Sequence, residues 1–110
     1  MRAPSVELDL ALARGVRISS DAREALVRIA CEAVSNAARH GQAHTVRVEL
    51  ERGEHVRFRV VDDGVGFDPS IARAGRFGLV SMRERAQSVG GSFRVRSAPG
   101  TGTEVEVELP

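Results

Sequence analysis

The sequence Cys31-Glu32-Ala33-Val34-Ser35-Asn36-Ala37-Ala38-Arg39-His40-Gly41 forms the second half of a helix predicted over about residues 21–40. At about 3.6 residues per turn, one side of this helix carries a polar stripe roughly 100° wide, made of Glu32, Asn36, Arg39 and His40. The neighbouring side is apolar and should face the core; it holds Leu26, Ala30, Ala33 and Ala37. From this stretch alone, the stripe is either the wall of a ligand pocket or a solvated helix face with one Glu32–Asn36 contact.

The composition is typical of one globular domain, which we expect to span residues 1–110, with 42% hydrophobic and 28% charged residues. No apolar run approaches the ~20 residues that span a bilayer, and nothing at the N-terminus indicates a signal peptide. A net charge of +1 gives no electrostatic argument for nucleic acid or for direct membrane contact. The single cysteine, Cys31, excludes an internal disulfide, and we expect it to be a small buried residue.

The pattern before and around the helix predicts one strand and a capped helix start. Apolar and polar residues alternate over residues 6–13, which predicts a half-buried strand. Ser19-Ser20-Asp21 offers N-cap residues, and Asp21 with Glu24 has the spacing of a capping box at the start of the helix. Gly41 is the expected C-terminal stop.

The rest of the chain adds two predicted hairpins and a second helix. Alternation over residues 45–50 and 55–61 predicts two strands joined by a turn, and residues 93–96 and 104–109 repeat the pattern with arginines set opposite glutamates. A second helix is predicted from about Gly78 to Val89, ended by Gly90 and Gly91. This order predicts an α/β (α+β) two-layer sandwich, in which a mixed, mostly antiparallel sheet carries the helices on one face.

A long segment without clear periodicity lies between Val61 and Gly78, and such loops usually bind a ligand or move. It opens with Asp62-Asp63-Gly64-Val65-Gly66, directly after a strand, where an aspartate is held rigidly and glycines allow close approach of a flat ligand. Gly78 opens the second helix, whose free backbone N–H groups suit phosphate. Each of these signals is weak when taken alone.

The combination is more specific. Glu32-x-x-x-Asn36, Asp62-x-Gly64-x-Gly66, Gly78-Leu79 and the closing Gly102-Thr103 occur in an order and spacing that resemble the ATP-binding catalytic domain of sensor histidine kinases. That domain has the Bergerat fold of the superfamily of gyrase, Hsp90, kinase and MutL ATPases. The stretch from Gly78-Leu79 through Met82-Arg83-Glu84-Arg85-Ala86 resembles the kinases whose partners are NarL-type response regulators.

The resemblance implies ATP and Mg²⁺ as ligands and assigns roles to particular residues. It implies that Asn36 coordinates Mg²⁺ and that Asp62 binds the adenine amino group, with support from Thr103. It also implies that nearby residues line the nucleotide, and these are Arg39, His40, Gly64, Gly66, Gly75, Gly78 and Leu79. Residues 67–77 match the lid over the nucleotide. Glu32 is left with three alternatives, namely a catalytic base, an organiser of Mg²⁺ or water, or a support for the pocket.

Two features depart from the family. Arg76 stands where a glycine is usual, so Gly75 would serve by a one-residue shift. His40, His44 and His55 do not lie in a helical phosphoacceptor motif, so we expect the substrate histidine on a dimerisation and phosphoacceptor domain elsewhere. The expected setting is cytoplasmic, within a sensor that is free or membrane-anchored, and the isolated domain is expected to be a monomer.

The sequence leaves three functions open. The first is a histidine protein kinase domain that transfers the γ-phosphoryl group of ATP to a histidine. The second is a free-standing serine kinase of the anti-sigma factor type. It is favoured because these 110 residues contain no helical dimerisation hairpin, and disfavoured by the Met82–Ala86 motif. The third is an interaction module without nucleotide. Phe67 and Phe77 are interpreted as lid or core packing residues rather than as adenine-stacking residues, and Asp63 as a turn or N-cap-like acid.

Overall fold

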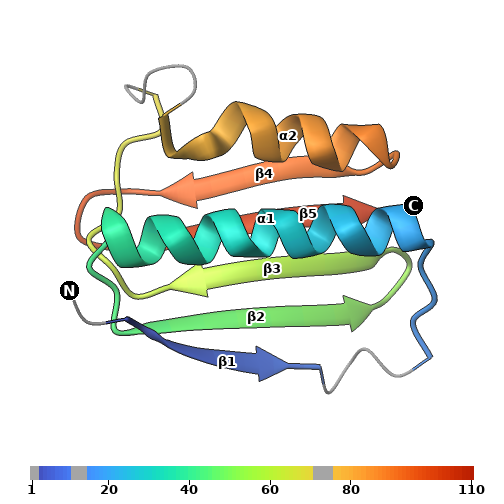
Figure 1. Ribbon diagram of the computed structural model, residues 1–110, viewed down its shortest axis with the longest axis horizontal. Helices are drawn as coiled ribbons and strands as arrows, with labels where there is room; N and C mark the ends of the chain where they lie inside the picture. Colours follow the sequence, from blue (N-terminus) through green and yellow to red (C-terminus); the bar gives the residue numbers. More distant parts are fainter. Residues whose placement is uncertain (1–2, 11–14, 71–75) are drawn as a thin grey trace.

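The computed structural model describes residues 3–10, 15–70 and 76–110, which form a sheet covered on one face by helices (Figure 1). The sheet has five strands in the order β1-β2-β3-β5-β4. β1 pairs with β2 in parallel, and the other pairs are antiparallel. The strand bounds are β1 Ser5–Asp9, β2 Thr45–Arg52, β3 Val56–Asp62, β4 Ser92–Ser97 and β5 Thr103–Leu109. The predicted two-layer fold with a mixed, mostly antiparallel sheet is confirmed.

Two helices form the second layer: α1 Ser20–Arg39, which lies over the middle of the sheet, and α2 Leu79–Ser88, which lies beside α1 over β4 (Figure 1). A short 3-10 turn over residues 76–78 leads into α2. α2 ends in a Schellman motif, because Gly90 N–H donates to the Gln87 carbonyl (3.0 Å) and Gly91 N–H to the Ala86 carbonyl (2.9 Å). The predicted glycine stop of this helix is therefore confirmed.

The start of α1 agrees with the prediction in part: an N-cap within residues 19–21 is confirmed, but the capping box is not. The Ser19 side chain caps the helix by accepting a hydrogen bond from Ala22 N–H at 3.0 Å. Asp21 lies within the first turn, and Glu24 pairs with Arg28 at 3.3 Å, so the predicted capping box is wrong. Ser19, two residues before Asp21, caps the helix because its hydroxyl can reach the free N–H groups of the first turn.

The core lies between the helices and the inner face of the sheet, and its largest fully buried side chains are Ile29, Val46, Met82 and Val107. Cys31 is exposed, contrary to the prediction. It stands two residues from both Ile29 and Ala33, which are buried, and two residues correspond to about 200° around a helix, so its side chain points away from the sheet.

β1 also differs from the prediction. The strand ends at Asp9, and the predicted extension toward residue 13 falls partly outside the described residues. Its apolar residues are open to solvent, with Val6 50% and Leu8 68% exposed. β1 is an edge strand that packs alongside β2, and neither helix covers it (Figure 1). Alternation predicted the strand correctly, but the cover over its apolar side depends on tertiary structure.

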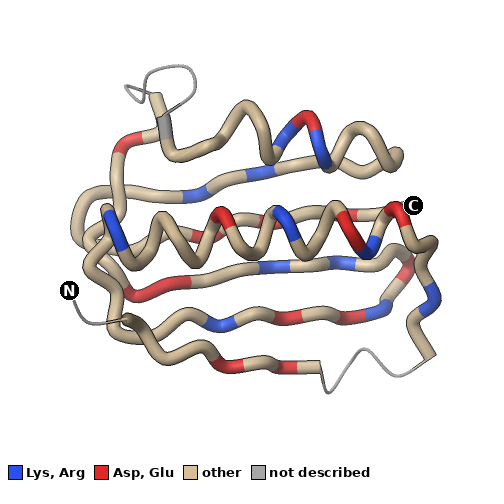
Figure 2. Tube along the Cα trace, in the orientation of Figure 1, with Lys and Arg blue, Asp and Glu red and all other residues tan. Residues whose placement is uncertain are grey.

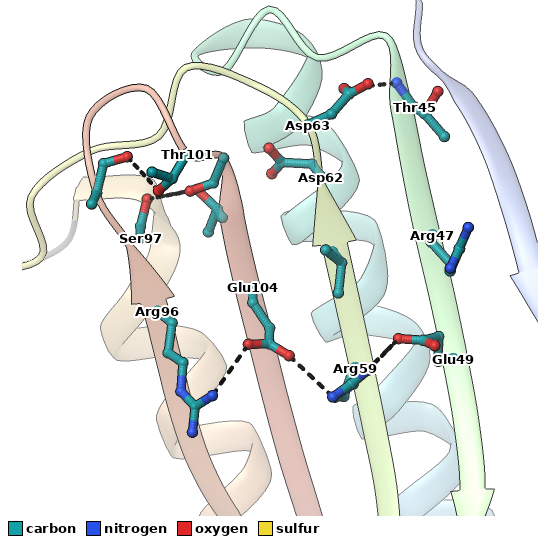
Figure 3. Close-up of a pocket in the computed structure, with 14 residues that line it drawn as sticks. Thr45, Arg47, Glu49, Arg59, Asp62, Asp63, Arg96, Ser97, Thr101 and Glu104 are labelled. Atoms are coloured by element: carbon teal, nitrogen blue, oxygen red, sulfur yellow. Dashed lines mark hydrogen bonds and ion pairs between the residues drawn. The ribbon is translucent and has the colours of Figure 1, made fainter.

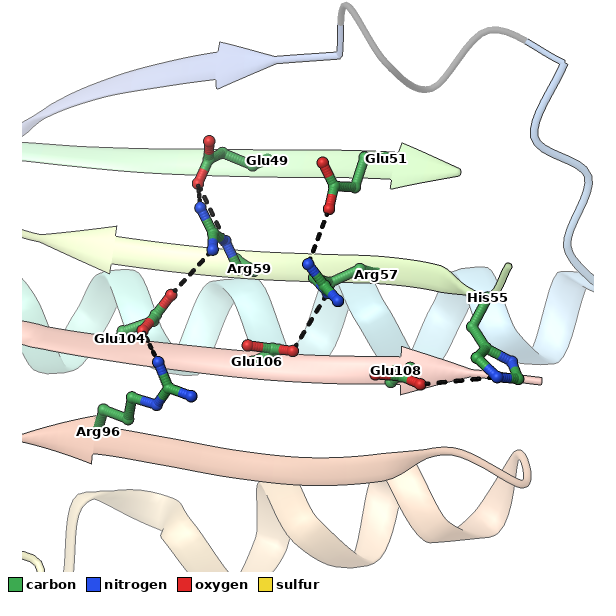
Figure 4. A network of polar contacts seen from close by, with 9 residues as sticks. All are labelled: Glu49, Glu51, His55, Arg57, Arg59, Arg96, Glu104, Glu106 and Glu108. Carbon is green, nitrogen blue, oxygen red and sulfur yellow. Dashed lines mark hydrogen bonds and ion pairs between the residues drawn. The ribbon is translucent and has the colours of Figure 1, made fainter. Parts of the chain in front are cut away.

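Neighbouring strands of the sheet carry residues of opposite charge (Figure 2). Arg59 of β3 pairs with Glu49 of β2 at 2.8 Å and with Glu104 of β5 at 3.4 Å, and Arg57 pairs with Glu106 at 3.3 Å (Figure 4). Such exposed pairs each contribute about 0–1 kcal/mol. The outer face is therefore polar, and the apolar surface of the sheet is gathered on the helix side. Among the described residues, neither helix has the length and apolar character needed to cross a membrane.

Candidate functional site

A pocket of about 240 Å³ lies between α1, the inner face of the sheet and the segment that leads into α2. Its apolar wall comes from the sheet and α2, with Val60, Leu79, Met82 and Val105. Its polar groups come from one end of α1 and from strand ends, with Asn36, His40, Asp62 and Thr103. An apolar slot with a few fixed polar groups is the usual form of a site for a small organic ligand.

The structure brings six of the sequence-predicted site residues to this pocket: Asn36, His40, Asp62, Gly66, Leu79 and Thr103. Glu32, Gly64 and Gly78 are not among its lining residues. Arg39 lies elsewhere, in a separate hollow shared with Ser5 and Thr45. Gly75 lies outside the described residues. The polar stripe predicted along α1 is thus divided. Asn36 and His40 line the pocket, whereas the Arg39 side chain lies toward the start of β1.

Asp62 ends β3 and presents its carboxylate to the pocket. Gly64 N–H donates to its Oδ1 at 2.8 Å. Burial raises the pKa of Asp62, and the hydrogen bonds from the backbone of Gly64 and Thr103 oppose that rise. A half-buried carboxylate fixed by backbone donors beside Val60 and Val105 is suited to accept a hydrogen bond from a ligand amine.

The neighbouring residue, Asp63, binds the backbone outside the pocket. Its Oδ1 accepts hydrogen bonds from the backbone N–H groups of His44 (2.8 Å) and Thr45 (3.0 Å), where β2 begins (Figure 3). These bonds lower the pKa of Asp63, the one from Thr45 most strongly. The sequence indicates a turn or N-cap-like acid at Asp63, but its carboxylate instead binds the start of β2, 18 and 19 residues away in the sequence, and is turned away from that of Asp62.

Asn36 has an unusual environment. Its Nδ2 donates to the Phe77 carbonyl at 2.5 Å, whereas its Oδ1 is buried without a hydrogen-bond partner among the described residues. An unpaired buried acceptor costs about 1–3 kcal/mol, and native structures rarely leave one without a reason. The Oδ1 atom is therefore available to a cation or to a donor that enters the pocket.

Two aromatic rings close one side of the pocket. Phe67 and Phe77 are stacked with ring centroids 4.4 Å apart, and His40 meets Phe77 edge-on at 5.1 Å. Phe77 has a positive φ of 61°, a conformation that costs a non-glycine residue about 1–2 kcal/mol. Contacts with Asn36 and His40 hold it there. Both phenylalanines pack on each other and also line the pocket, so their interpretation as packing residues stays a prediction.

Glu32 is placed beside the start of α2. Gly78, with φ 64°, is the N-cap of α2, and a Cβ atom there would overlap the Glu32 carboxylate. A carboxylate is electrostatically favoured at a helix N-terminus. Gly64 has a comparable packing role, because a Cβ atom would lie 2.5 Å from the carbonyl oxygen of Gly41 at the end of α1.

Sequence reasoning missed Ser97, at the end of β4. Its Oγ accepts a hydrogen bond from Phe67 N–H at 2.8 Å and lies 2.9 Å from Thr103 Oγ1. Ser97 is the register partner of Thr103 in the β4–β5 hairpin. A hydroxyl residue in that position opposite Thr103 is the sequence signal that would have found it.

Comparison with known proteins gives a consistent picture. A family model described as histidine kinase-, DNA gyrase B-, and HSP90-like ATPase matches residues 21–110. The sensor histidine kinase LiaS of Bacillus subtilis is 42% identical over 94 residues, which are 84% of this chain and 26% of that protein. The sensor protein VraS of Staphylococcus saprophyticus is 41% identical over 86 residues, or 77% of this chain and 25% of that protein. The chain thus spans about a quarter of the length of these relatives.

Solved structures share the fold. The blue-light activated histidine kinase of Erythrobacter litoralis EL346 superposes with a TM-score of 0.79 at 24% identity, over all of this chain and 36% of that one. The ATP binding domain of PrrB from Mycobacterium tuberculosis superposes with a TM-score of 0.69 at 21% identity, over all of this chain and 82% of that one. At these identities the likeness supports the two-layer fold alone.

Proposed function

Because this chain belongs to the family of histidine kinase-, DNA gyrase B- and HSP90-like ATPases, we propose that residues 1–110 form the Mg²⁺-ATP-binding catalytic domain of a sensor histidine kinase. In this proposal the domain transfers the γ-phosphoryl group of ATP to a histidine on a separate dimerisation and phosphoacceptor domain. The observation that carries the proposal is the pocket itself, with the Asp62 carboxylate and the unpaired Asn36 Oδ1 both in its lining.

The adenine end of the site is assigned to the strand ends. Asp62 accepts a hydrogen bond from the exocyclic amine, and Thr103 adds a hydroxyl beside it. The base would lie against the apolar wall formed by Val60, Met82 and Val105. A carboxylate can accept but not donate, so this end favours a base that carries an amino group.

The residues also fit a magnesium ion brought in by the nucleotide. No cluster of three or more His, Cys, Asp or Glu side chains in residues 3–10, 15–70 and 76–110 could hold a metal ion by itself. Mg²⁺ commonly takes one or two protein oxygens and completes its shell with phosphates and water. Asn36 Oδ1 supplies one such oxygen. When bound there, the ion would neutralise negative charge on the phosphates.

The start of α2 and the nearby α1 side chains are assigned to the phosphates. The first N–H groups of α2 lack intrahelical partners and suit anions, and His40 lines the pocket on the same side as Asn36. Arg39 lies in another hollow, which favours His40 as the basic contact. Glu32, packed against Gly78, is assigned a supporting role at that helix start.

The acceptor and the partners follow from the same proposal. His44 and His55 are exposed at strand ends, and His40 belongs to the pocket, which favours an acceptor histidine on another segment or chain. The downstream partner would be a NarL-type response regulator, as the Met82–Ala86 motif suggests. The domain would act in the cytoplasm as a monomer, within a sensor that is free or membrane-anchored.

Asn36→Ala tests the site. Calorimetric titration with a non-hydrolysable ATP analogue should show wild-type affinity raised about tenfold by Mg²⁺, and the variant should lose that gain because the amide oxygen is gone. Cys31→Ala is the matched control, since Cys31 is exposed on the opposite side of α1. Equal Mg²⁺ dependence in Asn36→Ala and Cys31→Ala would contradict the assignment, and absence of binding by the wild type would contradict the function.

The acceptor is tested by phosphotransfer. The domain is incubated with γ-labelled ATP and the dimerisation hairpin of a relative such as LiaS. Label on the hairpin that is lost in acid and kept in alkali indicates phosphohistidine, as proposed. Acid-stable label on a serine of a protein substrate, with an unlabelled hairpin, would instead support the serine kinase alternative.

A further inference from the structure

We propose that Ser97 is a positioning residue that fixes the proton of the Thr103 hydroxyl and thereby sets the preference of the pocket for adenine over guanine. The inference rests on the proposed nucleotide site and adds a specificity role to a residue outside the sequence motifs. Thr103 lines the pocket and Ser97 does not, and the two residues are register partners in the β4–β5 hairpin. Figure 3 shows Ser97 at the end of β4, near the turn that leads into β5.

Ser97 makes three short contacts that together use its hydrogen-bonding capacity. Its Oγ accepts from Phe67 N–H at 2.8 Å, donates to the Gly102 carbonyl at 3.0 Å, and lies 2.9 Å from Thr103 Oγ1. A serine hydroxyl has one proton and two lone pairs. Phe67 occupies one lone pair, so the contact with Thr103 must use either the proton or the second lone pair.

Counting protons favours one arrangement. Gly102 is buried, and a carbonyl oxygen can only accept, so donation from Ser97 satisfies that group. Thr103 must then donate its own proton to Ser97. Donation from Ser97 to Thr103 instead would take the Ser97 proton away from the Gly102 carbonyl. In the favoured arrangement, the Thr103 proton points away from the pocket and only lone pairs face a ligand.

This arrangement discriminates between purines at their 6-position. Adenine carries an amino group there, whose two hydrogens can be accepted by Asp62 and Thr103. Guanine carries a carbonyl oxygen, which would meet the Asp62 carboxylate or the Thr103 lone pairs without a donor. A site built to hydrogen-bond one group strongly rejects an analogue that cannot make that bond. Releasing the Thr103 proton would supply a donor and weaken this rejection.

The same serine fixes the loop that follows β3. Phe67 N–H is bound to Ser97, and two residues earlier the Val65 carbonyl accepts from Gly100 N–H at 2.6 Å. The loop is therefore held to the β4–β5 turn at two points. Loss of the Ser97 hydroxyl frees Thr103 and one of these attachments together, so the experiment must separate the two effects.

The test compares Ser97→Ala with Ser97→Thr and with Thr101→Ala. The control Thr101 lies in the same turn, is exposed, and donates to the Ala98 carbonyl at 2.9 Å without contact to Thr103. Calorimetry gives the ADP and GDP affinities of each protein, and amide hydrogen exchange follows Phe67. Ser97→Ala should reduce the ratio of ADP to GDP affinity about tenfold, equivalent to ~1.4 kcal/mol, and should accelerate exchange at Phe67. Ser97→Thr and Thr101→Ala should keep the wild-type ratio.

The outcomes separate the two proposals. An unchanged purine ratio in Ser97→Ala, with ADP still bound, would overturn the role of Ser97 and leave the proposed function standing. A wild-type domain that binds neither nucleotide would overturn the proposed function and the Ser97 role with it. If Ser97→Ala fails to fold, Ser97→Cys takes its place, because a thiol keeps the volume but hydrogen-bonds weakly; it should show the same loss of purine preference.

Discussion

Replacing Asp62 by alanine is expected to weaken the binding of ADP or an ATP analogue about 100-fold. A hydrogen bond to a charged group is worth about 1.5–3 kcal/mol, and the Asp62 carboxylate is held in place by Gly64 N–H at 2.8 Å. The apolar wall of Val60 and Val105 remains in the variant, so residual affinity should show little preference among bases. Calorimetric titration measures both quantities.

Asp63→Ala is the matched control for this prediction. It removes an adjacent carboxylate that binds the backbone of His44 and Thr45 outside the pocket. We expect it to keep nucleotide affinity within about twofold and to lower the unfolding temperature, because two backbone N–H groups lose a charged partner. Equal affinity losses in the two variants would show that Asp62 acts through the loop rather than through the ligand.

The pH dependence gives a second measurement on Asp62. Burial raises the pKa of this carboxyl, so on acidification it gains a proton earlier than an exposed aspartate. Binding requires the ionised form as acceptor, and affinity should fall as the pH drops through the raised pKa. In the folded state the ionised form is disfavoured relative to the unfolded chain, so the Asp62 ionisation lowers stability as the pH rises through that pKa. Asp62→Asn should lose both dependences.

Much of the fold was predictable because burial repeats with the local periodicity of the backbone. In β3 the buried residues Phe58 and Val60 alternate with Arg57 and Arg59, whose partners lie on neighbouring strands. Such alternation determines both the strand and the face it presents to the core. The same reasoning gave α2, whose buried residues Met82 and Ala86 are one turn apart.

The errors arose where the outcome depends on segments distant in the sequence. Leu8 alternates as a core residue should, yet it is 68% exposed because no helix lies over β1. Ser97 stands opposite Thr103 in the β4–β5 hairpin, but its other partner, Phe67, lies 30 residues away in the sequence. The buried Asn36 Oδ1 likewise depends on the placement of Phe77, 41 residues away. A linear pattern carries little of this information.

Gly66→Ala is expected to destabilise the domain by about 3 kcal/mol or more. Gly66 has φ 69°, and a Cβ atom there would overlap the Ala98 carbonyl oxygen and lie 2.9 Å from that of Gly102. Backbone atoms cannot rotate aside as a side chain can, so the loop after β3 would have to move away from the β4–β5 turn. Strain and displacement of this kind produce the large values seen for single substitutions.

Gly100→Ala separates this steric effect from the cost of the backbone conformation. Gly100 also has a positive φ, 85°, but a Cβ atom there would meet nothing within 4 Å. It should therefore lose only the ~1–2 kcal/mol that a left-handed conformation costs an alanine. Denaturant unfolding of both variants measures the difference. Gly66 lies in the loop after β3, between the pocket residues Asp62 and Phe67. Gly66→Ala should therefore also lose nucleotide binding, whereas Gly100→Ala should keep it. Equal destabilisation of the two variants would show that the close backbone contact of Gly66 with the β4–β5 turn does not contribute to stability.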